Sequence, residues 1–218
     1  MRNLFGYDSK LIQKLNFISD LMILNVLTVL CSIPIVTMGA AITALYDAIW
    51  RMQEGEGKLP AAFWKAFKSN FKKSTIIWLI FLPLGLIIAW NFNKVFMTDQ
   101  LFPVVFSLFA VLWWAFSLAW VFPMQSRFEN TVWGTIKNSL LLPIGYFPRT
   151  LLMAFLNLLP FILFLAPDTG SIITFTLGGL IWVLIYFSTV AYINMKLMGK
   201  AFDRFFAQAA AAAADEEE

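Results

Sequence analysis

Long apolar runs separated by short polar segments are the feature that most limits what this chain can fold into. A helix needs roughly 20 apolar residues to cross a hydrocarbon layer of about 30 Å. Of the 218 residues, 60% are hydrophobic and only 13% are charged, against roughly 25% charged in a typical soluble domain. The chain is therefore predicted to be all-α, a polytopic transmembrane helical bundle, with spans over residues 75–92, 103–124, 150–166 and 172–194.

The N-terminal part contains either one or two further membrane helices. A helix that begins near Leu11 has about 22 residues, enough to cross, before Pro34 interrupts it. Residues 35–50 then form a second span or a buried, kinked continuation. Two crossings give six membrane helices with both termini inside, whereas one gives five with the N-terminus outside. We favour six, because a basic, uncleaved N-terminus is costly to translocate.

The basic residues predict the topology. Fifteen of the sixteen Lys and Arg residues precede the first run, lie in two long inserts, or follow the last run. The turns over 93–101 and 167–170 carry only Lys94. Because basic residues stay on the cytoplasmic side, we expect the inserts, residues 54–73 and 125–149, and the C-terminus to be cytoplasmic. One membrane domain then covers residues 1–206, and residues 207–218 form a low-complexity tail.

The first insert contains an amphipathic segment over residues 60–74. Phe63, Phe67 and Phe71 recur every four residues and so share one helical face, with Trp64 beside them. The opposite face carries three lysines: Lys65, Lys68 and Lys72. An aromatic face, a lysine face and an apolar run that follows at once are typical of a helix lying flat on the cytoplasmic surface of a membrane.

The second insert has a similar aromatic and basic pattern. Trp133 and Lys137 lie four residues apart, so a helix would place them on one face. Arg127 and Glu129 open the insert just inside the membrane, either as a solvated or interhelical ion pair or as part of a docking surface. Both inserts are candidate surfaces for lipid or for a partner protein.

Polar residues within the apolar runs are candidates for function, because an ionisable group at membrane depth is expensive. Asp20 and Asp47 are the intramembrane carboxylates. Asp47 lies four residues before Arg51, a spacing that permits a neutralising ion pair. Asp20 lies near the cytoplasmic end of its helix, where it can reach the interface. Asn25 can form hydrogen bonds between helices, a common way for membrane helices to associate.

The composition excludes several classes of site. The chain has no His and one Cys, Cys31, inside an apolar run. Sites that ligate a metal through His, and catalysis that depends on His, are therefore absent. No Walker-type phosphate loop occurs, so the chain does not hydrolyse ATP itself. We expect no enzyme activity, cofactor or metal, and we attribute the lysines to anionic lipid headgroups and not to nucleic acid.

Three stretches together resemble the YesL-like family of bacterial membrane proteins, whose function is uncharacterised. They are residues 15–49 with the turn SIPIVTMGAA, residues 63–80 with FWKAFKSNFKKS, and residues 122–142 with FPMQSRFENTVWG. The resemblance runs over most of residues 1–206. It implies the bacterial cytoplasmic membrane and a setting beside sugar ABC importers and glycan-degrading enzymes. It carries over no catalytic or binding residue.

Two functional hypotheses follow. The first is a non-enzymatic accessory subunit or assembly partner of a carbohydrate ABC importer, with membrane lipids and the permease and ATPase subunits as partners. The second is a small solute transporter or channel that acts alone or as a homo-oligomer, with Asp20 and Asp47 along a polar path. A transporter requires polar groups that converge within the membrane. An accessory subunit requires an exposed surface that a partner can cover.

Overall fold

The computed structural model describes residues 10–56, 58–97, 100–165 and 179–216, and all its regular elements are helical. The helices, in chain order, are α1 (Lys10–Ser32), the short 3-10 helix η1 (Ile35–Thr37), α2 (Met38–Gln53), α3 (Leu59–Phe96), α4 (Leu101–Arg127), α5 (Val132–Gly145), α6 (Phe147–Leu165), the π-helix η2 (Trp182–Tyr186) and α8 (Phe187–Glu216). The turn predicted over 167–170 lies outside the described residues.

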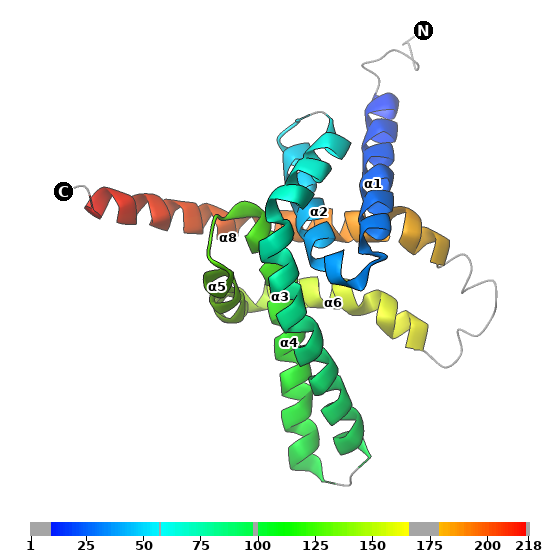
Figure 1. The fold of residues 1–218 in the computed structure, drawn as a ribbon, viewed down its shortest axis with the longest axis vertical. Coiled ribbons are helices and arrows are strands. Elements are labelled where there is room, and N and C mark those ends of the chain that lie inside the picture. Colours follow the sequence, from blue (N-terminus) through cyan, green and yellow to red (C-terminus); the bar gives the residue numbers. More distant parts are fainter. Residues whose placement is uncertain (1–9, 57, 98–99, 166–178, 217–218) are drawn as a thin grey trace.

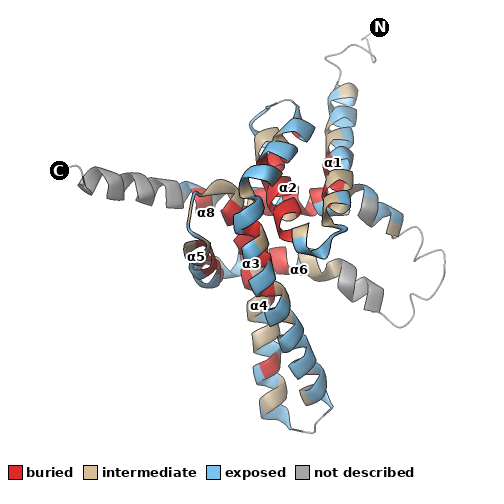
Figure 2. Cartoon of the chain, viewed as in Figure 1, coloured by how far each residue is buried: buried red, intermediate tan, exposed pale blue. Residues whose placement is uncertain are grey.

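Helix α2 is the centre of the molecule. It packs against α1, α3, α4 and α8, and most of its residues are buried (Figures 1 and 2). Its buried positions are mainly small: Gly39, Ala40, Ala41, Ala44 and Ala48. Small side chains let helix backbones approach closely, which is how helices associate in an apolar environment.

The closest approach is between the start of α2 and the middle of α3. A Cβ added to Gly39 would lie 2.6 Å from the Ser74 carbonyl oxygen and 2.6 Å from Trp78 Cβ. One turn further along α2, the Thr43 and Ser74 hydroxyls are hydrogen-bonded at 2.9 Å. The Trp78 indole N–H donates to the Ile35 carbonyl at 2.7 Å, so η1 is held at the same level of α3.

Helix α3 is one continuous helix of 38 residues. The separate, flat-lying helix predicted over 60–74 is instead its first part, and the span predicted over 75–92 continues it without a break. The physical reason is local: no Gly or Pro occurs between Phe63 and Leu82, so nothing ends the helix. A continuous helix has no break near residue 74 at which a segment on the membrane surface could turn into a crossing one, and its internal proline, Pro83, lies further along.

The distal parts of α3 and α4 form an antiparallel hairpin that extends away from α2 (Figure 1). Trp114 of α4 fills the space that a side chain at Gly85 would occupy, and its indole N–H donates to the Phe81 carbonyl at 3.0 Å. The outer surface of this hairpin is apolar and exposed, including Leu86, Ile87, Trp90, Phe102 and Phe106. A surface of this kind is suited to lipid.

After α4 the chain changes direction. The axes of α5 and α6 are bent by 111° at the break between them. Pro143 and Gly145 precede this break and Pro148 follows it, and these residues disrupt helical hydrogen bonding or weaken the helix. Helix α6 runs across the direction of α3 and α4, and so does α8, so the apolar helices do not form one parallel bundle (Figure 1).

Four helices are long and apolar enough to cross a membrane: α1, α3, α4 and residues 179–199. The number rises to five if the bent pair of α5 and α6 is one span. Helix α2, with 16 residues, is shorter than an ordinary span. The structure thus describes an all-helical protein with four to five candidate spans, and the six-helix topology stays a prediction.

We expect Gly39→Ala to destabilise the protein by about 1–3 kcal/mol, because the new methyl group must push α2 away from α3. The free energy of unfolding, measured by titration with SDS in mixed micelles, tests this. Gly199→Ala is the matched control, since a Cβ at Gly199 meets no atom within 4 Å. Equal stability of the two variants would show that the close contact of α2 with α3 is not required.

Candidate functional site

The first part of α3 carries a basic surface on the side turned away from α2. Lys65, Lys68 and Lys72 are exposed, and the neighbouring Trp64 is 43% exposed. The opposite side is buried, with Phe63 fully enclosed. Within the described residues, the ion pairs are those of Arg51, so no carboxylate neutralises these three lysines. We call Trp64, Lys65, Lys68 and Lys72 the α3 basic surface.

The residues predicted in the second insert lie on different features of the fold. Trp133 and Lys137 are exposed on α5, and Glu129 is exposed in the loop before it. Arg127, at the end of α4, instead lies over the Trp50 ring, with Cζ 3.3 Å from the ring centroid. The Arg127 guanidinium therefore packs against α2, while the other three residues face outward.

The α4–α5 connection is tied to the first part of α3 by polar contacts. Lys73 Nζ donates to the Asn130 carbonyl at 3.0 Å. The buried Gln125 side chain donates to Asn70 Oδ1 at 3.3 Å and accepts from the Thr135 hydroxyl at 3.1 Å. Helix α5 begins at Val132 because Thr131 caps it, accepting from the Gly134 N–H at 3.1 Å.

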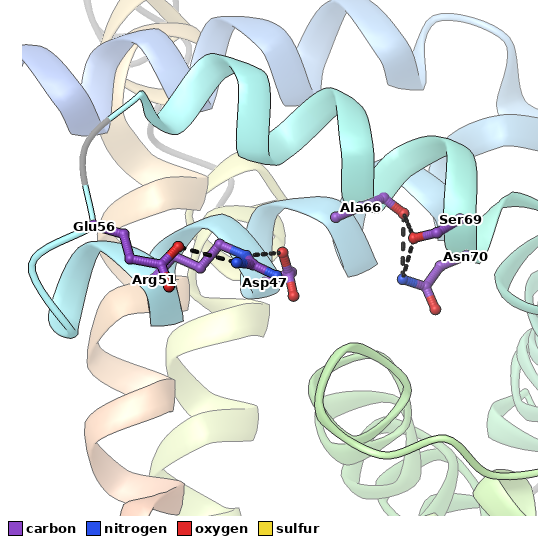
Figure 3. Close-up of polar contacts among 6 residues, drawn as sticks. All are labelled: Asp47, Arg51, Glu56, Ala66, Ser69 and Asn70. Atoms are coloured by element: carbon purple, nitrogen blue, oxygen red, sulfur yellow. Dashed lines mark hydrogen bonds and ion pairs between the residues drawn. The ribbon is translucent and has the colours of Figure 1, made fainter.

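The ion pair that the spacing of Asp47 and Arg51 permits is present. Arg51 Nε donates to Asp47 Oδ2 at 2.8 Å, and Arg51 Nη1 donates to Glu56 Oε2 at 3.0 Å (Figure 3). These hydrogen bonds, the one to Asp47 first, raise the pKa of the Arg51 guanidinium. The buried Asp47 is thereby neutralised at the end of α2, and this arrangement suits a structural role.

Asp20 is separate from this cluster. It is half-buried on α1 and has no side-chain hydrogen bond or ion pair within the part of the chain that the structure describes. Among the described residues, Asp47 has its ion pair with Arg51 and not with Asp20. A shared site of the two carboxylates therefore stays a prediction.

Asn25 links α1 to the π-helix. Its side chain is fully buried, and its Oδ1 accepts from the Ser188 N–H at 2.8 Å. A π-helix carries one extra residue in a turn and so shifts the backbone hydrogen bonds. Ser188 is the second residue after this irregular turn, and the Asn25 amide oxygen accepts from its N–H. Insertions of this type are frequent at functional sites, which makes this contact a candidate for function as well as for packing.

A second polar contact lies between α2, α6 and α8, and the sequence alone did not reveal it. Asn194 Nδ2 donates to the Tyr46 hydroxyl at 3.0 Å and to Asn157 Oδ1 at 3.3 Å. Asn194 is fully buried, and its own Oδ1 has no donor among the described residues. Polar residues within apolar runs were the available signal, but a single sequence does not show which of them meet.

The chemistry available to these residues is limited to hydrogen bonding and charge. Among the described residues, no group of three His, Cys, Asp or Glu side chains could hold a metal ion. Apart from Asp47, the buried polar side chains of the described residues are amides and hydroxyls, which can bind a neutral polar molecule or water. Among the exposed charged residues, the lysines can bind phosphates or carboxylates.

A family described as a protein of unknown function, DUF624, has a model that matches residues 21–92. The match covers about a third of the chain, from α1 through α2 into α3. It agrees with the resemblance to an uncharacterised family, while the YesL-like name stays a prediction. No curated protein and no solved structure matches the chain.

We expect Asn25→Leu to destabilise the protein by about 1–3 kcal/mol, because the Ser188 N–H would lose its acceptor in an apolar environment. Titration with SDS measures the change in free energy of unfolding. Thr28→Val is the matched control: Thr28 is also buried on α1, but its hydroxyl bonds only to the Leu24 carbonyl of its own helix. An equal loss of unfolding free energy in both variants would show that the hydrogen bond between Asn25 and Ser188 adds no stability beyond that of a bond within one helix.

Proposed function

We propose that this chain is a non-enzymatic membrane protein that acts as an accessory subunit or assembly partner of a bacterial carbohydrate ABC importer. In this proposal the α3 basic surface is the docking surface for the partner, on the cytoplasmic side of the membrane. The observation that carries the proposal is the continuity of α3 beyond the part that can lie in the bilayer.

The length of the uncharged part of α3 supports this. Residues 74–93 carry no Asp, Glu, Lys or Arg, and Lys73 and Lys94 flank them. At about 1.5 Å per residue this stretch is roughly 30 Å long, the thickness of the hydrocarbon core. At the far end Lys94 Nζ lies 5.2 Å from the ring centroid of the exposed Trp90, a pairing typical of an interface.

The rest of α3 then rises out of the membrane. Counted from Ser74, Lys72 lies roughly 3 Å and Trp64 about 15 Å further along a straight helix. The headgroup layer on each side is only about 5–8 Å thick. Lys72 therefore lies among headgroups, whereas Trp64 and Lys65 lie above them, where a protein partner can reach them.

The composition of this raised part suits a protein interface. Trp64 offers a large apolar contact, and tryptophan is among the residues that contribute most to binding energy. No acidic residue occurs between Lys58 and Lys94, so the lysines have no neutralising neighbour on their own helix. An acidic partner segment would supply the complementary charge and fix the orientation of the complex.

The identity of the importer rests on the resemblance described above, which implies a sugar-uptake setting. Cytoplasmic inserts and a cytoplasmic C-terminus in the bacterial cytoplasmic membrane are part of the same proposal. The predicted six membrane helices would additionally require α6 and α8 to turn parallel to α3, since both run across it (Figure 1). In this arrangement the Asp47–Arg51 pair and the Trp50–Arg127 contact stabilise the end of α2 next to the docking surface.

The decisive experiment is purification from the native membrane in mild detergent, with mass spectrometry of the proteins retained at fixed stoichiometry. We expect permease or ATPase subunits of an ABC importer at a constant ratio. Changing Trp64→Ala, Lys65→Glu and Lys68→Glu together should reduce their recovery at least tenfold, because the apolar contact is lost and the charge is reversed.

The control is Lys10→Glu with Lys14→Glu, which reverses two exposed lysines on α1. This variant should retain the same subunits as the unaltered protein. Recovery of a homogeneous protein without importer subunits would refute the proposal. Loss of the partner in the control as well would mean that overall charge, and not the α3 basic surface, determines binding.

The second candidate function is a solute transporter or channel, and the contact of Tyr46, Asn157 and Asn194 is the observation that favours it. Asn194 Oδ1 is a buried acceptor that meets no donor in the described part of the chain, and a polar solute could supply one. In this hypothesis Asn194→Leu, and Asp20→Asn with Asp47→Asn, abolish transport. Full uptake by cells that carry either variant would exclude the residues concerned.

A further inference from the structure

Helix α5 has one buried face and one exposed face, and the exposed face is mostly apolar. The exposed side chains recur at helical spacing: Trp133, Lys137, Leu140, Leu141 and Ile144. Trp133 is 72% exposed and Ile144 is 63% exposed. The other face is buried against the rest of the protein through Thr135, Ile136 and Ser139. Four large apolar groups and one lysine in a helix of 14 residues give it the pattern of a helix at a membrane surface.

The direction of α5 is the second observation. Figure 1 looks nearly along α5, while α3 and α4 run in the plane of the view. Helix α5 therefore crosses the hairpin of α3 and α4. If the uncharged part of α3 crosses the bilayer, α5 lies parallel to the membrane plane.

The level of α5 along α3 is the third observation. The contact of Lys73 Nζ with the Asn130 carbonyl fixes the loop immediately before α5. The hydrogen bonds of Gln125 to Asn70 and to Thr135 fix the first turn of α5 at the same level. Asn70 and Lys73 lie directly before the uncharged stretch of α3, so α5 lies where that stretch enters the membrane.

We propose that α5 is an in-plane membrane anchor whose exposed face lies at the boundary between lipid headgroups and acyl chains. Trp133, Leu141 and Ile144 enter this boundary, and the Lys137 ammonium binds the phosphate of an anionic lipid. An amphipathic helix in this position buries its apolar face by about 5–10 Å in the boundary. This inference replaces the first insert with the second as the element that lies flat on the membrane.

The partner of α5 is lipid and not a protein, because α5 differs from the α3 basic surface in polarity and in its position relative to the headgroups. The exposed face of α5 is apolar and lies level with the lipid headgroups. The bilayer that α3 crosses therefore covers this face. The α3 basic surface carries three lysines and rises above the headgroups. The inference depends on α3 crossing the bilayer, but it does not depend on an importer subunit.

Site-directed spin labelling tests the proposal. In a Cys31→Ala background, single cysteines replace Trp133, Lys137, Leu140 and Ile144, all of them exposed, so that the label disturbs no core contact. The full chain is reconstituted in vesicles of phosphatidylethanolamine and phosphatidylglycerol. Label depth is measured from the ratio of collisions with oxygen to collisions with a water-soluble nickel complex.

All four labels should lie at similar depth at the membrane boundary. If α5 instead stood upright, the depths at positions 133 and 144 would differ by roughly 16 Å, at about 1.5 Å per residue. Labels that collide mainly with the nickel complex would place α5 in water. Either of these two results would overturn the proposal.

Labels at Leu79 and Leu86, which are exposed on α3, are the controls. Their depths should differ by about 10 Å if α3 crosses the bilayer. Equal depths would show that α3 does not cross the bilayer, and this would overturn the proposed orientation of α5. Because the vesicles contain no other protein, these measurements test the position of α5 in the membrane independently of the proposed accessory role.

The phosphate contact is tested separately with Lys137→Gln. We expect this variant to lose the shift in label mobility at Ile144 that replacing phosphatidylcholine with phosphatidylglycerol causes in the unaltered chain. An unchanged lipid dependence in the variant would show that Lys137 does not bind the anionic lipid.

Discussion

The close contact of α2 with α3 is the interaction on which the rest of the fold depends. Gly39 lets the two backbones approach until no side chain fits between them. The small residues that follow on α2 keep the helix narrow, so that α1, α4 and α8 can also pack against it. Larger residues at these positions would keep the neighbouring helices from packing against α2.

Hydrogen bonds between side chains and other helices set the register of this packing. Trp120 donates to the Thr150 hydroxyl at 2.8 Å and joins α4 to α6. Thr43 and Ser74 join α2 to α3, and Gln125 joins α4 to both α3 and α5. In apolar surroundings an unpaired polar group is costly, so a shift of register that separates such partners is disfavoured. Apolar contacts alone would tolerate several registers.

The continuity of α3 changes how the polar surfaces relate to the membrane. The lysines of the first insert would all touch headgroups if the segment lay flat. In the proposed arrangement the continuous α3 instead separates them by height, with Lys72 near the membrane and Lys65 further out. Helix α5 instead runs across α3, since the chain leaves helical structure at residues 128–131 before it and at Tyr146 after it (Figure 1). Under the two proposals, the same aromatic and lysine composition therefore serves a protein partner on α3 and lipid on α5.

Much of this arrangement could be predicted from local sequence. The apolar runs predicted helices because their length and hydrophobicity decide between membrane and water without reference to other segments. The Asp47–Arg51 pair followed from an i, i+4 spacing within one helix. The contacts of Tyr46 with Asn194 and of Asn25 with Ser188 could not be predicted, because each joins residues more than a hundred positions apart.

The sequence by itself determined that the chain is helical, apolar and suited to a membrane, and which residues bear the charges. Only the tertiary structure decided that α2 is central, that residues 60–92 are one helix, and that α5 lies across it. The reason is that hydrophobicity and helical spacing act within a segment. The direction of each helix and the helices that it contacts depend on how closely backbones can approach and on hydrogen bonds between segments that are distant in the chain.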